Sequence, residues 1–155
     1  MMRRVAAPTD DQLRQMPLFR RLSAEDRTRI AAHARLVRFP KHARIFDEGA
    51  PADAFLAVVD GRVKISKATP AGKELILEIF GPGDPLGTVA VYEDRAFPAS
   101  AIALEDTTCV RIERRPFFAL LEQHPALVRG LLSGLTLRLA ELTRRLAEVL
   151  SLIHI

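Results

Sequence analysis

Between residues 46 and 65 the chain reads FDEGAPADAFLAVVDGRVKI, a pattern typical of short β-strands joined by tight turns. The apolar run Ala54–Val59 has the length of one strand and is far shorter than the ~20 residues of a membrane-spanning helix. Val63 and Ile65 then alternate with polar residues, as in a strand with one buried face. Asp60-Gly61 separates the two runs and predicts a hairpin turn between them.

More short strands are expected on the C-terminal side of this segment. Thr69-Pro70-Ala71-Gly72 predicts a second turn, and apolar residues alternate again in residues 75–79. Residues 80–87 are too rich in glycine and proline for a strand interior and predict a loop. Ala99–Leu104 and Thr107–Ile112 are predicted as further strands. Short strands at this spacing indicate a sandwich or a barrel.

Helices are expected on both sides of the strands, so the chain divides into three regions. Residues 1–36 are predicted as an N-terminal helical segment, in which Ser23 caps a helix and Asp26 follows three residues later. Residues 37–113 hold the strands. Residues 114–155 are predicted as a short helix followed by a long one, which begins at Pro125 because proline is favoured at the first helical position.

The long helix carries an apolar seam with heptad spacing. Its members recur in steps of four and three residues: Val128, Leu132, Leu135, Leu139, Leu142, Leu146, Val149 and Ile153. This period is typical of helices that pair with another helix, and we expect a homodimer through the seam. A second apolar strip, Leu127, Leu131 and Leu150, is expected to contact the β-body. The alternative is an amphipathic helix folded back entirely onto its own domain.

Composition and motifs exclude several classes of protein. A single cysteine, Cys109, cannot form an internal disulfide, which indicates a cytoplasmic protein. The net charge of +4 comes from arginines spread along the whole chain, which favours a solvated surface over a nucleic-acid site. The histidines, His33, His42, His124 and His154, are too scattered for a metal site, and no Gly-x-Ser-x-Gly or Walker loop occurs. We therefore expect neither an enzyme nor a metal site built from clustered histidines.

Residues 46–65 resemble the first half of a cyclic-nucleotide-binding domain, and the loop Gly81–Asp84 with Gly87 after it fits the same pattern. Phe97–Asp106 is similar to the Crp/Fnr branch of bacterial transcription regulators in particular, and the resemblance covers about residues 12–150. It implies a mainly β fold with flanking helices: an eight-stranded double-stranded β-helix (a jelly-roll-like β-roll), a long dimerisation helix and a C-terminal helix-turn-helix.

The helix-turn-helix has no counterpart here, since it would need on the order of 60 further residues. Residues 151–155 contain no glycine or proline that would end the long helix, so we expect a fragment of a longer regulator rather than a stand-alone sensor. The resemblance then implies a module that senses a small-molecule effector and forms a homodimer, and that contacts DNA only through the missing part. The identity of the effector does not follow from the sequence.

The resemblance also implies three side chains for cyclic nucleotide binding: a glutamate directly after the last loop glycine, then an arginine and a hydroxyl residue about ten residues later. Thr88, Pro98 and Ala99 stand at these positions, so we expect that cyclic AMP does not bind tightly. A helix N-terminus and a few polar groups remain. The candidate effector contacts are Gly87, Thr88, Val89, Ala90, Arg95, Ser100 and Thr143.

Other functions of the same fold stay open at this point. The chain could be a stand-alone or signalling cyclic-nucleotide-binding module, of the kind found in channels and kinases. It could also sense a gas through haem, with His33, His42 or Cys109 as the axial ligand. Cys109 inside a predicted strand equally fits a small buried hydrophobic residue. An iron–sulfur cluster is excluded, because it needs about four cysteines.

Overall fold

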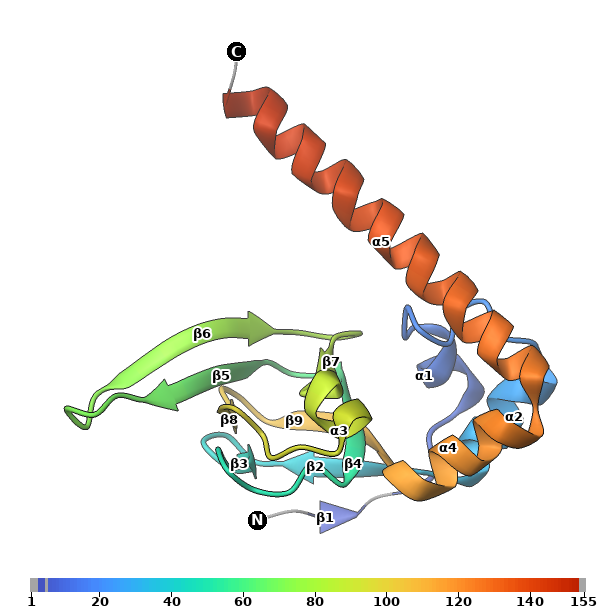
Figure 1. The fold of residues 1–155 in the computed structure, drawn as a ribbon, viewed down its shortest axis with the longest axis horizontal. Helices are drawn as coiled ribbons and strands as arrows, with labels where there is room; N and C mark the ends of the chain where they lie inside the picture. Colours follow the sequence, from blue (N-terminus) through green and yellow to red (C-terminus); the bar gives the residue numbers. More distant parts are fainter. Residues whose placement is uncertain (1–2, 5, 154–155) are drawn as a thin grey trace.

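Two antiparallel β-sheets form the centre of the computed structural model, which describes residues 3–4 and 6–153 (Figure 1). The strand order is β1-β2-β9-β4-β7 in the first sheet and β3-β8-β5-β6 in the second. The strands are β1 (Arg3–Arg4), β2 (Ala34–Phe39), β3 (Arg44–Phe46), β4 (Ala54–Asp60), β5 (Val63–Ala68), β6 (Glu74–Phe80), β7 (Pro85–Leu86), β8 (Ser100–Ala103) and β9 (Thr107–Glu113). Strands β2 to β9 form the expected eight-stranded β-roll, which confirms the predicted fold class.

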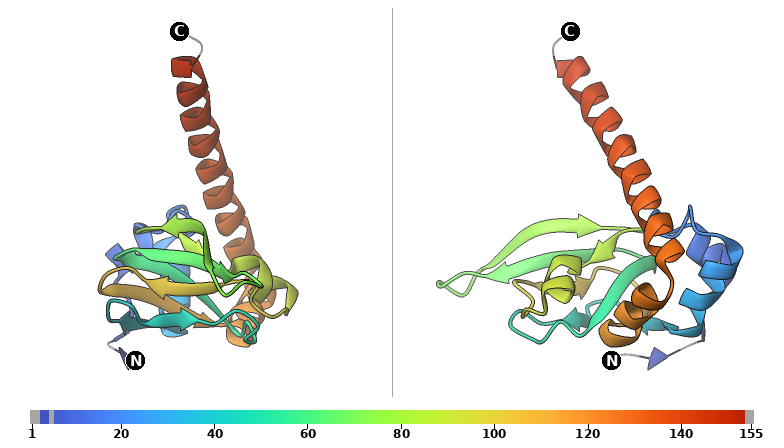
Figure 2. Two further views of the ribbon diagram at one scale, coloured as in Figure 1. Left: turned by 90° about the vertical axis from the view of Figure 1, so that its left-hand side faces the viewer. Right: turned by 45° about the vertical axis from the view of Figure 1, so that its right-hand side comes forward.

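Helices flank the roll, most of them at one end. They are α1 (Asp10–Arg14), α2 (Ala24–Ala32), α3 (Thr88–Glu93), α4 (Arg114–Gln123) and α5 (Pro125–Ile153). α5 starts beside α2 and α4 and projects away from the roll (Figures 1 and 2). It begins at Pro125, as predicted. Ser23 caps α2 as predicted, since its Oγ accepts the N–H of Asp26 at 3.1 Å.

β4 separates two apolar cores, because its side chains alternate between the two faces of the first sheet. Leu56 and Val58 lie inside the roll and pack with Val63 of the second sheet. Phe55 and Ala57 pack on the other side, where α1, α2, α4 and the start of α5 cover the sheet. Each buried aliphatic side chain contributes about 1.5–3 kcal/mol. The helical end is therefore part of the same folded body.

The Asp60-Gly61 turn does not join a hairpin, so that prediction was wrong. β4 pairs with β7 and β9 in the first sheet, whereas β5 pairs with β6 and β8 in the second. The chain crosses between the sheets here because Arg62, the residue after the turn, is hydrogen-bonded to residues that are far away in the sequence. The carbonyl of Arg62 accepts the N–H of Leu104 at 2.8 Å and the hydroxyl of Thr107 at 3.3 Å.

Two element boundaries also differ from the prediction. The N-terminal helical region ends at Ala32 rather than at residue 36, because Ala34–Phe39 form β2 and pair with β9. Within the predicted loop 80–87, Pro85–Leu86 form the short strand β7 beside β4. β7 lies at the edge of its sheet, where a proline without a backbone N–H is tolerated.

The start of α5 is held against the N-terminal loop by a close backbone approach at Gly134. A Cβ atom on this buried glycine would come within 2.7 Å of the carbonyl oxygens of Pro17 and Leu18. Backbone atoms of a packed loop cannot give way as the end of a flexible side chain can. This contact therefore fixes the place where the helix leaves the body.

We predict that Gly134→Ala lowers the free energy of unfolding by roughly 1–3 kcal/mol, the usual cost of overpacking. In an unhindered helix interior the same change is stabilising, because alanine has the higher helix propensity. Urea denaturation followed by circular dichroism measures the effect. Gly130→Ala is the control, since the close contact of its Cβ would be with Cδ2, the flexible end of the Leu22 side chain, and the change should cost less. A Gly134→Ala variant as stable as the wild type would contradict the close approach.

Candidate effector site and dimer surface

The short helix α3 rests on two stacked phenylalanine rings. The ring centroids of Phe46 and Phe97 are 3.7 Å apart, and the ring planes differ by 9°. Gly87, the N-cap of α3, has φ +63°, and a Cβ at this position would come within 2.7 Å of Cε1 of Phe97. Both the backbone conformation and the aromatic floor therefore require glycine here. Ala90 and Val91 are buried in the same apolar cluster.

The remaining predicted effector contacts do not meet in one pocket. Thr88 is exposed and lies at an apolar cavity beside α3. Val89 is exposed as well, at 69%. Ser100 is buried, and its Oγ accepts the N–H of Glu48 at 2.9 Å. It borders a different hollow, between β3, β5 and β8.

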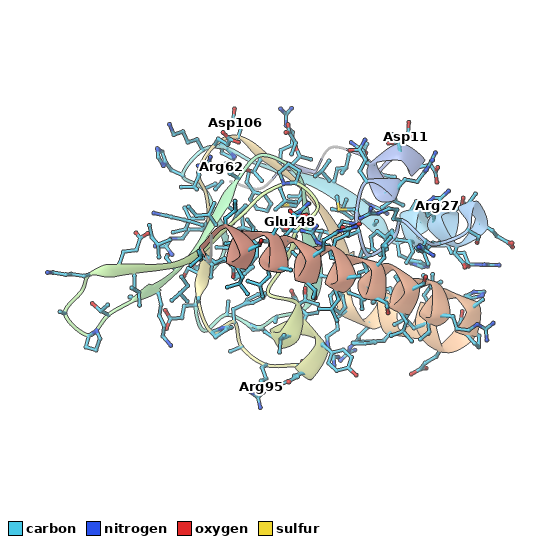
Figure 3. The ribbon with its side chains drawn as sticks, turned by 90° about the horizontal axis from the view of Figure 1, so that it is seen from above. Asp11, Arg27, Arg62, Arg95, Asp106 and Glu148 are labelled. Carbon is cyan, nitrogen blue, oxygen red and sulfur yellow. The ribbon has the colours of Figure 1, made fainter. Side chains whose placement is uncertain are left out.

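Arg95 and Thr143 are surface residues in the single chain. The guanidinium of Arg95 pairs with Glu93 at 2.9 Å, and its side chain is 75% exposed. Figure 3 shows this side chain projecting away from the body. Thr143 lies on the exposed part of α5, where its hydroxyl donates to the carbonyl of Leu139 at 2.9 Å. Neither side chain supplies a charge or a hydroxyl to the floor beneath α3.

A cluster of charges, which the sequence did not reveal, ties the middle of α5 to the body. A carboxylate oxygen of Glu141 accepts a hydrogen bond from Arg20 at 3.1 Å, and the other lies 3.5 Å from Arg138. Arg138 also lies 3.7 Å from Asp84. Burial raises the pKa of Glu141, but Arg20 and Arg138 outweigh this effect and hold the pKa below its ordinary value. Three segments distant in sequence therefore meet in the cluster formed by Arg138 and Glu141, with Arg20 on one side and Asp84 on the other.

Cys109 lies inside the roll with no exposed surface. Burial raises the pKa of its thiol to about 12, because an apolar environment disfavours the thiolate. His33 and His42, by contrast, are exposed. Among residues 3–4 and 6–153, histidine, cysteine, aspartate and glutamate side chains form no group of three or more that could hold a metal ion.

The predicted dimer seam of α5 is open to water in the single chain. Val128 is half-buried, and the rest of the seam is 45–69% exposed: Leu132, Leu135, Leu139, Leu142, Leu146, Val149 and Ile153. Leu127 and Leu131 are buried against the body, as predicted, but Leu150 is 46% exposed. The second strip is thus shorter than predicted, because α5 leaves the body before it reaches Leu150. No helix within the described ranges has the length and apolar character that crossing a membrane requires.

β6 forms a second exposed apolar surface. Leu75, Ile76, Leu77 and Ile79 are each 52–54% exposed, so both faces of this edge strand are open. The alternation of residues 75–79 predicted the strand, but it gave no sign that the strand lies at an edge. Figures 1 and 2 show β6 on the side of the roll from which α5 projects. The two apolar surfaces therefore belong to the same side of the molecule.

Comparison with known proteins agrees with this architecture. The family profile of the cyclic nucleotide-binding domain matches residues 36–124. A CRP-like cAMP-activated global transcriptional regulator of Mycobacterium tuberculosis is 29% identical over 114 residues, which are 74% of this chain and 51% of the relative. The chain thus spans about half the length of this relative.

Two solved structures are similar over most of the chain. DNR from Pseudomonas aeruginosa has a TM-score of 0.77 and 29% sequence identity, and the match covers 92% of this chain and 62% of DNR. The N-terminal domain of a transcriptional regulator from Streptomyces coelicolor has a TM-score of 0.71 and 26% identity, and the match covers 88% of this chain and 95% of that domain.

We predict that the Cys109 thiol of the native protein does not react with Ellman's reagent at pH 8, whereas the urea-unfolded chain reacts fully. Between the ordinary pKa of 9.0 and the native value of about 12, the unfolded thiol is ionised and the native thiol is not. Native stability contributed by this group is therefore complete below pH 9 and is lost as the pH rises toward 12. Cys109→Ala should remove this part of the alkaline loss. Rapid labelling of the folded chain would contradict the buried position.

Proposed function

The chain belongs to the cyclic nucleotide-binding domain family, in its Crp/Fnr branch, and from this premise we propose that it is the effector-sensing and dimerisation module of a DNA-binding transcription regulator. The observation that carries the proposal is the exposed seam of α5. A helix with leucine at heptad positions on its open side is suited to pair with a second copy. DNA recognition is proposed to belong to the remainder of a longer protein, since the chain matches about half of its relative.

Pairing of two α5 helices would bury the seam and remove its apolar surface from water. Burial of one leucine side chain contributes about 1.5–3 kcal/mol, so even partial burial of the seam from Leu132 to Val149 amounts to several kcal/mol. The exposed apolar residues of β6 lie on the same side and would flank such a helix pair. A homodimer therefore accounts for most of the exposed aliphatic surface of the single chain.

We predict that the wild-type chain is a dimer at micromolar concentration and that the double variant Leu139→Asp, Leu142→Asp is a monomer, because two carboxylates per chain cannot be buried unpaired. Light scattering coupled to size exclusion reads the mass directly. Thr136→Asp with Ala140→Asp is the matched control, since both residues are exposed on α5 but lie outside the seam. If the wild-type chain is a monomer at this concentration, the seam is not a dimer interface and the prediction is wrong.

The nucleotide pocket is proposed to be degenerate. A cyclic phosphate brings a full negative charge into a partly buried site, which is costly unless it is paired. Pro98 has no side-chain donor and no backbone N–H, and Thr88 is shorter than the glutamate expected at its position. Arg95, the nearest replacement for the missing cation, is exposed and already pairs with Glu93.

We expect cyclic AMP to bind at least ~10²-fold more weakly than it binds to a complete pocket, since each missing charge-assisted hydrogen bond removes about 1.5–3 kcal/mol. Isothermal titration calorimetry tests this on the wild type and on the variant Thr88→Glu, Pro98→Arg, Ala99→Ser. The variant should bind cyclic AMP at least ~10-fold more tightly. A wild-type dissociation constant in the low micromolar range would show that other side chains complete the pocket.

The haem-sensor alternative has less support than the proposed function. Of the three candidate axial ligands, Cys109 is enclosed in the roll, and burial raises the pKa of its thiol to about 12. A thiol ligates a metal as the thiolate, so this group is held in the wrong protonation state. We therefore propose a module without haem, whose effector is a different small molecule.

A further inference from the structure

An apolar cavity of about 310 Å³ lies where α5 joins the body. Its walls come from the N-terminal loop, from β4 and β9 on the helical side of the first sheet, and from α3, α4 and α5. Of the seven predicted effector contacts, only Thr88 borders it. The cavity is therefore a different site from the degenerate nucleotide pocket.

Aromatic rings dominate one side of the cavity. The ring of Phe55 lies 4.9 Å from that of Phe117 and 5.9 Å from that of Phe118, measured between centroids. Tyr92 of α3 lies 6.0 Å from Phe118 in an edge-to-face arrangement. Such rings favour another aromatic ring beside them over a flexible chain, because stacked and edge-to-face pairs add to the apolar burial.

Charges at the cavity are already compensated. Asp84 and Arg138 border it and lie 3.7 Å from each other, and Arg138 also lies 3.5 Å from Glu141. An anionic or cationic ligand would find no free counter-charge and would lose its hydration. The polar groups left for a ligand are the hydroxyls of Thr88 and Tyr92, which stand one helical turn apart on α3 and are both exposed.

We infer that this cavity binds a small uncharged aromatic compound, about the size of two fused rings, with one hydroxyl or N–H group directed at Thr88 or Tyr92. The size follows from the volume, since an apolar cavity of about 150 Å³ accepts benzene. An almost wholly apolar pocket with a few polar groups at one side is the usual form of a small-molecule site. The inference rests on the proposed function and identifies the effector class of the module.

An occupant of this cavity contacts the roll and α5 together. Phe55 and Ala57 line it from β4, while Leu131 and Leu135 line it from α5. Leu135 is also a member of the exposed seam. A ligand that packs better against one orientation of α5 than another shifts the population of helix orientations, and with it the geometry of the seam.

The test uses the whole chain and 2-naphthol, an uncharged fluorescent two-ring compound, in a calorimetric and fluorescence titration. Ala57→Phe places a ring inside the cavity and should weaken binding at least 10-fold. The control Ala68→Phe makes the same change at an exposed position of β5 and should leave binding unchanged. Leu121→Trp fills the cavity from α4 and replaces Ala57→Phe if that variant does not fold. The anion 2-naphthoate should bind the wild type at least 10-fold more weakly than 2-naphthol.

Light scattering on the same samples separates this inference from the proposed function. A wild-type dimer without saturable 2-naphthol binding overturns the cavity site alone. Equal binding by wild type, Ala57→Phe and Leu121→Trp also overturns it, because the compound would then bind elsewhere. Naphthoate binding as tight as naphthol binding overturns the assignment to an uncharged ligand.

Discussion

The close approach at Gly134 sets the direction in which α5 leaves the roll, because no larger residue fits between the helix and the carbonyl oxygens of Pro17 and Leu18. On the body side of this contact, Leu127 and Leu131 are buried. Leu135, one helical turn beyond Leu131, is half exposed. The buried and the open part of this one helix, and with them the seam through which we propose dimerisation, follow from where this backbone contact lies.

Local features of the fold could be predicted from the sequence, because the forces that determine them act between residues close together in the chain. The cap at Ser23 needs only the N–H of Asp26, and the turn at Thr69–Gly72 joins the two paired strands beside it. The Asp60-Gly61 turn was misread as a hairpin because strand pairing depends on distant residues. Arg62 is bonded to Leu104 and Thr107, more than forty positions away, and no local pattern encodes that choice.

The candidate site shows the same division between local and distant information. The heptad seam is a property of one helix, so its periodicity was enough to predict the open side chains from Leu132 to Val149. The same pattern did not predict that Leu150 is open as well. The apolar cavity draws its lining from six separate segments and has no signature in any of them. At the nucleotide position, the family scaffold is retained in Gly87 and α3, while the floor is built from Phe46 and Phe97. The resemblance therefore predicted a glycine and a short helix at this place, which the structure has, but the predicted effector side chains do not meet in one pocket.

The cavity and the seam are joined by the geometry of a rigid helix. α5 touches the body near its start and again through Glu141, and the residues beyond Glu141 extend freely from these supports. A helix rises 1.5 Å per residue, so a small change of angle near Leu135 becomes a larger displacement at the far end. A ligand needs only a modest difference in affinity for two helix angles to alter the distal contacts of a dimer. The ion pairs of Glu141 with Arg20 and of Arg138 with Asp84 join the helix to the body, so such a movement would have to stretch or break them.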